Sequence, residues 1–241
     1  MEIAVLMASG MGTRMRPLTE TVPKPLIQVA GVPMIESVIA GLELRGVSMI
    51  YVVVGYLGKQ FEYLVRKYPN VCLINNPDFL KVNNISSIYY ACSVMRDMDC
   101  FICEADLYVA DQSIFEADLR QSCYYGKMVQ GCSEDWVFDL DGEEYITRVG
   151  KFGANQFNMV GIAYFKKREV NLLIDAVQAT YYTEGYENLF WDEVVNEHLQ
   201  KLRLKIHSVK ENQIVEIDTI EELENANARF LVSQAKERIQ S

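Results

Sequence analysis

The sequence predicts an α/β fold: a Rossmann-like, mostly parallel sheet covered by helices on both faces, with a smaller substrate-binding lobe. Three observations lead to this prediction. Short apolar runs alternate with helical stripes in the first half, the first of these runs enters a glycine-rich loop, and the second half changes to closely spaced short strands. Repeated β-α-β order implies parallel strands, because each crossover returns the chain to the same edge of the sheet.

The first half of the chain carries the alternation that predicts the parallel sheet. A helical stripe from Met34 to Leu42 follows Pro33, which suits a first helical turn, and precedes Gly46, which suits a helix end. Met49–Val54 is apolar throughout, as expected of a parallel strand covered on both faces. The other expected elements are strands Ile3–Ala8, Val71–Ile74 and Cys100–Cys103, and helices Phe61–Lys67 and Ser86–Met95.

The second half is expected to be richer in short strands. Asp141-Gly142 is a turn signal between two of them. The last helix should start at Thr219, where Glu222 completes a capping box. The expected strands are Met128–Cys132, Trp136–Leu140, Tyr145–Val149 and Met159–Phe165, with a closing pair at Leu204–Val209 and Ile214–Ile217. Helices are expected near 167–180 and 188–199, and Ile220, Leu223, Phe230 and Leu231 should face inward from the last helix.

Composition restricts the class of protein. The 241 residues suffice for one large domain, and a net charge of -10 gives no general attraction for nucleic acid or anionic membrane. Any anionic ligand must therefore meet a local basic cluster. The apolar N-terminal run is short and has no basic flank, so it is neither a signal peptide nor a membrane span, and we expect a cytoplasmic protein. Its six cysteines should be reduced and buried, with Cys100 and Cys103 on opposite faces of one strand.

A glycine-rich loop directly after the first strand predicts a phosphate site. Gly10 and Gly12 let backbone N–H groups approach an anion, and Arg14 adds a side chain able to bind phosphate oxygens in bidentate fashion. Lys24 follows within Pro23-Lys24-Pro25-Leu26. Met15 stands where a dinucleotide fingerprint needs its third glycine, and the Gly-Lys-Ser/Thr of a P-loop is absent from the sequence.

The combination of a strand, G-x-G-x-R and then P-K-P-L resembles the nucleotidyltransferase family that includes the sugar-1-phosphate nucleotidylyltransferases. This resemblance implies a GT-A-like nucleotidyltransferase fold whose loop wraps the triphosphate of an NTP. One domain over 1–241 would then contain a nucleotide-binding half at 1–110 and an acceptor-binding half at 111–241. The residues expected to bind the nucleotide from this loop are Ala8, Ser9, Gly10, Gly12, Thr13, Arg14 and Lys24.

Two acids at the ends of predicted strands are candidates to bind Mg²⁺. Asp106 follows the strand that contains Cys100 and Cys103, and Asp218 lies between a strand and the last helix. Magnesium prefers hard oxygen ligands and is held by one or two carboxylates together with substrate phosphates. The resemblance implies one metal-binding Asp in each of these positions. Glu104 is a weaker candidate, and Glu216 is expected to alternate away from the site. The other interpretations are a surface acid at Asp106 and a helix cap at Asp218.

The chain resembles one branch of this family nearly end to end, the bacterial CTP:phosphocholine cytidylyltransferases of the LicC type. The segments that carry this resemblance are Val54–Leu57, Asn83–Tyr89, Glu134–Trp136, Phe190–Asp192 and Ile214–Asp218. It implies CTP and phosphocholine as substrates. It also implies nucleotide contacts from the polar start of a helix, at Asn84, Ser86 and Ser87, where simple helix capping is the alternative.

The acceptor half contains both tryptophans of the chain. A quaternary ammonium donates no ordinary hydrogen bond and is held best by aromatic faces. Trp136 and Trp191 each adjoin an acid, and the resemblance favours them as walls of a choline box with Tyr186 and Asp192. The alternative is that these rings are core residues. Lys151 could meet the acceptor phosphate, although the segment around it departs from the family pattern.

The predicted reaction is Mg²⁺-dependent transfer of CMP from CTP to phosphocholine, giving CDP-choline and pyrophosphate. Arg14, Lys24 and Asp106 are the predicted catalytic residues. The reaction needs only positioning and charge neutralisation, because a phosphate oxyanion is already a nucleophile. Two alternatives stay open: the same chemistry on a sugar 1-phosphate or an aminoalkyl phosphonate, and a non-catalytic nucleotide sensor.

Overall fold

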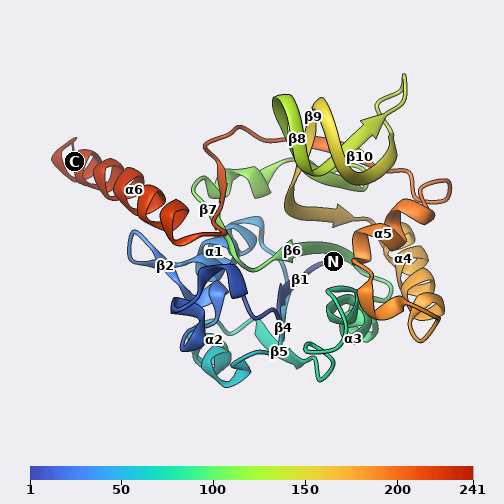
Figure 1. The fold of residues 1–241 in the computed structure, drawn as a ribbon, viewed down its shortest axis with the longest axis horizontal. Helices are drawn as coiled ribbons and strands as arrows, with labels where there is room; N and C mark the ends of the chain where they lie inside the picture. The colour runs from blue at the N-terminus through green and yellow to red at the C-terminus, as the bar shows by residue number, and fades with distance from the viewer. Residues whose placement is uncertain (241) are drawn as a thin grey trace.

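A seven-stranded sheet forms the centre of the computed structural model, which describes the backbone of residues 1–240 and the side chains up to Val232. Its strand order is β10-β8-β9-β6-β1-β4-β5 (Figure 1). The strands of this sheet are β1 Glu2–Ala8, β4 Met49–Val54, β5 Val71–Asn75, β6 Asp99–Glu104, β8 Cys123–Leu140, β9 Ile146–Phe165 and β10 Lys205–Ser208. Two small sheets pair β2 Gln28–Val29 with β3 Val32–Pro33, and β7 Leu107–Val109 with β11 Ile214–Glu216.

The parallel core of the sheet confirms the fold class that the first half predicts. Strand β1 lies between β4 and β6, parallel to both, and β5 continues the parallel set beyond β4. All four predicted strands of the first half are present. Because parallel strands end at the same edge, Ala8 of β1 and Glu104 of β6 open onto one side of the sheet. Strand β9 then adds to β6 in the antiparallel direction.

Helices cover both faces of this sheet. They are α1 Met34–Arg45, α2 Glu62–Lys67, α3 Ile85–Met95, α4 Lys167–Thr180, α5 Trp191–Glu197 and α6 Ile220–Gln240. The side chains of β1 alternate between two cores: Ile3 packs with α3, α4 and α5, and Ala4 packs with α1 and α2. Cys100 and Cys103 lie in different cores, as the alternation predicts. Cys72 and Cys132 are exposed, so the prediction that all six thiols are buried was wrong.

The second half differs from the sequence prediction in its strands. The segments predicted as four short strands belong to two long strands, β8 and β9, which remain paired through several bulges. Bulges let a ribbon bend without ending, so interruptions of the apolar pattern do not mark strand ends here. The predicted closing pair was also wrong, because β10 lies parallel to β8 and β11 lies antiparallel to β7.

The C-terminal helix α6 projects from the body of the protein (Figure 1). Its capping box is present: Glu222 N–H donates to Thr219 Oγ1 at 3.2 Å, and Thr219 N–H donates to Glu222 Oε2 at 2.9 Å. Leu223 and Phe230 contribute to a third apolar cluster, but Leu231 is 53% exposed, so its predicted inward position was wrong. Among the helices that the structure describes, none is both long and apolar enough to cross a membrane.

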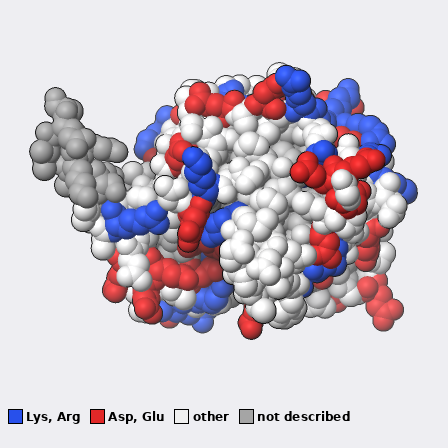
Figure 2. All heavy atoms as spheres, turned by 90° about the horizontal axis from the view of Figure 1, so that it is seen from above, with Lys and Arg blue, Asp and Glu red and all other residues white. Residues whose placement is uncertain are grey.

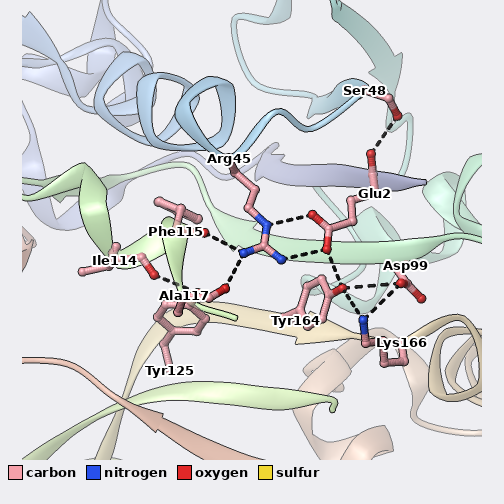
Figure 3. Close-up of polar contacts among 10 residues, drawn as sticks. All are labelled: Glu2, Arg45, Ser48, Asp99, Ile114, Phe115, Ala117, Tyr125, Tyr164 and Lys166. Carbon is pink, nitrogen blue, oxygen red and sulfur yellow. Dashed lines mark hydrogen bonds and ion pairs between the residues drawn. The ribbon is translucent and has the colours of Figure 1, made fainter. Parts of the chain in front are cut away.

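A polar network holds α1 and β9 against the starts of β1 and β6 (Figure 3). Arg45 donates two hydrogen bonds to the Glu2 carboxylate, each of 2.8 Å, and a third to the carbonyl of Phe115 at 3.0 Å. The Tyr164 hydroxyl donates to the same carboxylate at 2.7 Å. The hydrogen bond from Arg45 lowers the pKa of Glu2 despite its partial burial. This network lies at the strand edge opposite to Ala8 and Glu104.

We expect Arg45→Met to lower the free energy of unfolding by about 2–3 kcal/mol, because it removes charge-assisted hydrogen bonds and leaves Glu2 without its main partner. Urea unfolding measures this change. Arg120→Met is the matched control, since the ion pair of Arg120 with Asp118 is almost fully exposed and its loss should cost less than about 0.5 kcal/mol. Equal losses in the two variants would contradict a stabilising role for the network.

Candidate active site

A cleft of about 450 Å³ opens at the carboxyl ends of β1 and β6. Parallel sheets bind ligands at this edge. The loop after β1, the start of α3, the ends of β6 and β11, and the ribbon of β8 and β9 all contribute to its walls. Its lining includes thirteen predicted site residues: Ala8, Ser9, Gly10, Gly12, Arg14, Lys24, Asn84, Ser86, Ser87, Asp106, Trp136, Lys151 and Asp218. Thr13, Tyr186, Trp191 and Asp192 do not line it.

The loop after β1 has a shape that only glycine permits. Gly12 has a φ of +58°, and a Cβ atom there would lie 2.8 Å from Cβ of Lys24. Thr19 Oγ1 fixes the loop by donating to the Gly12 carbonyl at 2.9 Å. Met15 is fully buried in the third apolar cluster, which explains why the loop lacks a third glycine. The loop therefore keeps Gly10 and Gly12 open to the cleft while Met15 anchors it.

Lys24 connects the two predicted metal-binding acids. Its ammonium lies 2.7 Å from Asp106 Oδ2 and 2.7 Å from Asp218 Oδ1, and Arg14 Nη1 lies 2.7 Å from Asp218 Oδ2. Burial alone would lower the pKa of Lys24, but the two carboxylates outweigh it and raise the pKa. The ammonium is therefore charged. Segments from both ends of the chain thus meet at one buried cation.

Two further acids approach this cluster. Burial, together with the charges of Asp218 and Asp106, raises the pKa of Glu216 to about 7. Burial and Asp106 likewise raise the pKa of Glu104. Burial is the larger cause of both shifts, and the neighbouring carboxylates add to it. Glu104 and Glu216 both line the cleft, so the prediction that Glu216 alternates away from the site was wrong. Taken over the whole residue, Glu216 is exposed.

The acid cluster fits a divalent cation by the chemistry of its donors. Carboxylate oxygens are the hard ligands that Mg²⁺ prefers. Within the described residues, no group of three or more His, Cys, Asp and Glu side chains already surrounds one point as a complete metal cage. A magnesium ion here would therefore take its remaining ligands from substrate phosphates and water, as it does in many nucleotide sites.

The polar start of α3 forms the wall beside β1. Ser86 and Ser87 are almost fully buried and bond within the protein: Asn76 Nδ2 donates to Ser86 Oγ at 2.8 Å, and Ser87 Oγ donates to Ser9 Oγ at 3.4 Å. Asn84 Oδ1 accepts from the Trp191 backbone N–H at 3.0 Å. These contacts fix the wall and connect α3 to α5, and the side-chain oxygen of Asn84 is engaged in the connection.

The acceptor side of the cleft carries two aromatic rings and one lysine. Trp136 and Phe190 meet edge to face with ring centroids 5.5 Å apart. The ammonium of Lys151 lies 5.8 Å from the Trp136 centroid and 5.7 Å from the Phe190 centroid. Glu134 and Asp135 line the same region. Phe190 was not predicted as a site residue. Its position just before the start of α5 is the signal that could have distinguished it from Trp191, which faces inward.

Three predicted acceptor residues lie outside the cleft. Trp191 is 3% exposed and stacks on Tyr124 with centroids 5.7 Å apart. Asp192 is equally buried and accepts from the Tyr124 hydroxyl at 2.9 Å, and its burial raises its pKa to about 7. Tyr186 packs on Tyr181, at 4.8 Å between centroids. Trp191 and Asp192 do line a small hollow that shares Met7 and Glu104 with the cleft. The box predicted from two tryptophans is therefore not assembled in the cleft.

Comparisons with known proteins agree with this geometry. Residues 4–130, more than half of the chain, match the MobA-like NTP transferase domain. A 2-aminoethylphosphonate cytidylyltransferase of Lancefieldella rimae is 50% identical over 220 residues, which cover 91% of this chain and 89% of that protein. The chain belongs to the MobA-like NTP transferase family. It is a nucleotidyltransferase of the cytidylyltransferase group, which sets aside a non-catalytic sensor.

Two further relatives support this assignment. A choline-phosphate cytidylyltransferase of Streptococcus pneumoniae is 29% identical over 220 residues, covering 91% of this chain and 94% of that protein. The solved structure of the CTP:phosphocholine cytidylyltransferase LicC of the same species matches with a TM-score of 0.87 at 27% identity, covering 95% of this chain and 99% of that one. The predicted resemblance to the LicC type is thereby confirmed. Nucleotidyltransferases generally use a divalent metal, in keeping with the acid cluster.

The two tryptophans should respond differently to replacement. Trp191→Ala removes a buried ring and should lower the free energy of unfolding by about 3–5 kcal/mol, whereas Trp136→Ala, at the cleft wall, should cost much less. Urea unfolding of both variants measures the difference. Equal destabilisation by the two changes would contradict the assignment of Trp191 to the core and Trp136 to the cleft.

Proposed function

We propose that the protein transfers CMP from CTP to 2-aminoethylphosphonate, with Mg²⁺ held by Asp106 and Asp218. The observation that carries the choice of acceptor is the composition of the cleft around Trp136 and Phe190, where Lys151, Glu134 and Asp135 accompany this pair of aromatic rings. The relative that shares half of its aligned residues with this chain is named for the same acceptor.

The acceptor side suits a small zwitterion better than a trimethylammonium group. A quaternary ammonium is held by a cage of several aromatic faces. Here Trp191 and Tyr186 lie outside the cleft. Among the described residues that line it, Phe79, Trp136 and Phe190 are aromatic, and only Trp136 and Phe190 form the pair beside Lys151. A primary ammonium can instead donate hydrogen bonds to carboxylates such as Glu134 and Asp135. The phosphonate at its other end complements the positive charge of Lys151.

The reaction is substitution at the α-phosphorus of CTP. A phosphonate oxygen forms the new bond to this phosphorus, the bond to the bridging oxygen of the β-phosphate breaks, and pyrophosphate leaves with both electrons of that bond. No protein nucleophile is needed, because the oxyanion attacks directly. Arg14 and Lys24 hold the triphosphate and stabilise the charge that develops on pyrophosphate. When bound, Mg²⁺ adds charge neutralisation at the phosphates.

The remaining predicted nucleotide residues would act through position and backbone. Gly10 and Gly12 leave backbone N–H groups free to approach phosphate oxygens. Ala8, Ser9 and Thr13 frame the same loop, and Ser9 is held by donating its hydroxyl to the Val53 carbonyl at 3.1 Å. Asn84, Ser86 and Ser87 would support the base and ribose from the start of α3. Their contacts with Trp191 and Asn76 make them a fixed wall for the nucleotide.

Phosphocholine is the second candidate acceptor. It is favoured by the TM-score of 0.87 to the CTP:phosphocholine enzyme and by the alignment over most of both chains. The two acceptors differ in the head group that faces Trp136 and Phe190. A choline acceptor would need the rings to be vacated by the lysine ammonium that contacts them.

An initial-rate assay of pyrophosphate release distinguishes the acceptors. With CTP and Mg²⁺, we expect kcat/KM for 2-aminoethylphosphonate to exceed that for phosphocholine by at least about tenfold, since an aromatic contact worth about 1–2 kcal/mol is withheld from choline. Phosphoethanolamine and a sugar 1-phosphate complete the panel, with UTP as the nucleotide control. A preference for phosphocholine would overturn the acceptor, and a preference for UTP would overturn the nucleotide.

A further inference from the structure

The aromatic pair of the cleft already holds a cation of the protein itself. The Lys151 ammonium lies within 6 Å of both ring centroids, at 5.8 Å from Trp136 and 5.7 Å from Phe190, which is the range of a cation–π contact. The two rings belong to elements far apart in the sequence, β8 and the residue before α5. Together they form one site with room for a cation, and Lys151 fills it from the chain.

The backbone presents Lys151 to this site. In the ribbon of β8 and β9, Lys151 is the register partner of Trp136, so their side chains start as direct cross-strand neighbours. Arg148 fixes the backbone of β9 here by donating to the carbonyls of Lys151 and Phe152, both at 3.3 Å. Arg148 is itself held by two hydrogen bonds to Asp139 of 2.6 and 3.1 Å. The lysine therefore projects from a braced backbone.

The charge of Lys151 is not neutralised by an ion pair within the part of the chain that the structure describes. A second cation on the same ring faces would stand a few ångströms from the ammonium and be repelled by it, since unit charges at such distances interact strongly near a protein surface. An acceptor phosphonate would be attracted by the same charge. The charge of Lys151 thus repels the cationic end of an acceptor at the rings and attracts its anionic end.

We propose that Lys151 is a specificity-determining residue: its ammonium occupies the Trp136–Phe190 aromatic site and closes it to quaternary ammonium acceptors. This inference rests on the proposed function in taking an aminoalkyl phosphonate as the acceptor. A primary ammonium loses little by this closure, because the carboxylates of Glu134 and Asp135 remain available to it in the cleft. A trimethylammonium group loses the one kind of contact that suits it.

The test replaces Lys151 by Met, which keeps most of the length of the side chain and removes its charge. The measurement is kcat/KM for 2-aminoethylphosphonate divided by kcat/KM for phosphocholine, from pyrophosphate release with CTP. We expect this ratio to fall by about tenfold or more. The loss of the positive charge affects the anionic end of both acceptors alike, whereas the vacated rings can accept only the head group of phosphocholine. Lys151→Arg keeps a cation over the rings and should keep the ratio of the wild type.

The matched control is Lys205→Met. Lys205 makes the same kind of contact with the ring of Tyr145, at 4.8 Å, but lies outside the cleft lining, so its replacement should leave the ratio unchanged. Because Lys151 is exposed, its variants should keep the melting temperature of the wild type. A parallel loss with both acceptors in Lys151→Met, or no change in the ratio, would overturn the inference. A wild type that prefers phosphocholine would instead overturn the proposed acceptor. The preference of the wild type therefore tests the acceptor, and the change of the ratio in Lys151→Met tests the role of Lys151.

Discussion

The ammonium of Lys24 between Asp106 and Asp218 is the interaction on which the arrangement of the active site depends. Two carboxylates that share one location repel each other unless a cation lies between them. Lys24 supplies that cation at 2.7 Å from each acid. Room for it requires Gly12, since any side chain there would meet Cβ of Lys24. The loop glycine, the buried lysine and the two acids therefore form one constraint.

This constraint also explains the path of the C-terminal segment. Asp218 reaches the cluster because β11 pairs antiparallel with β7, and β7 begins at Leu107, the residue directly after Asp106. The pairing aligns Glu216 with Leu107 and directs its carboxyl group into the cleft. The division into a nucleotide half at 1–110 and an acceptor half at 111–241 stays a prediction. Asp218 belongs to the second half in sequence but contacts Lys24 of the first half. Figure 2 shows acidic and basic side chains interspersed over one face of the molecule, and Arg14 and Lys24 bring two positive charges into the cleft locally, each beside a carboxylate.

The sequence predicted the parts of the structure that are local. The strands β1, β4, β5 and β6 each carry a continuous apolar run, and the loop with Gly12 and Arg14 follows its strand directly, so pattern alone was sufficient. The partners of β10 and β11 depend on contacts between distant segments, which a pattern does not record. Bulges hid the continuity of β8 and β9 for the same reason. At α5, a difference of one residue decided which ring enters the cleft: Phe190 precedes the helix and Trp191 turns inward on its first turn.

The central claim is that Asp106 and Asp218 form one metal centre with the triphosphate. Electron paramagnetic resonance of Mn²⁺, which accepts the same oxygen ligands as Mg²⁺, measures this directly as protein-bound Mn²⁺ with CTP present and no acceptor. We expect Asp106→Asn and Asp218→Asn each to weaken binding of the Mn²⁺–CTP complex by about a hundredfold, since even outer partners of a metal are worth about 10–100-fold, while the exposed Asp118→Asn binds like the wild type. Unchanged binding in either cluster variant, with its fold intact, would contradict the account.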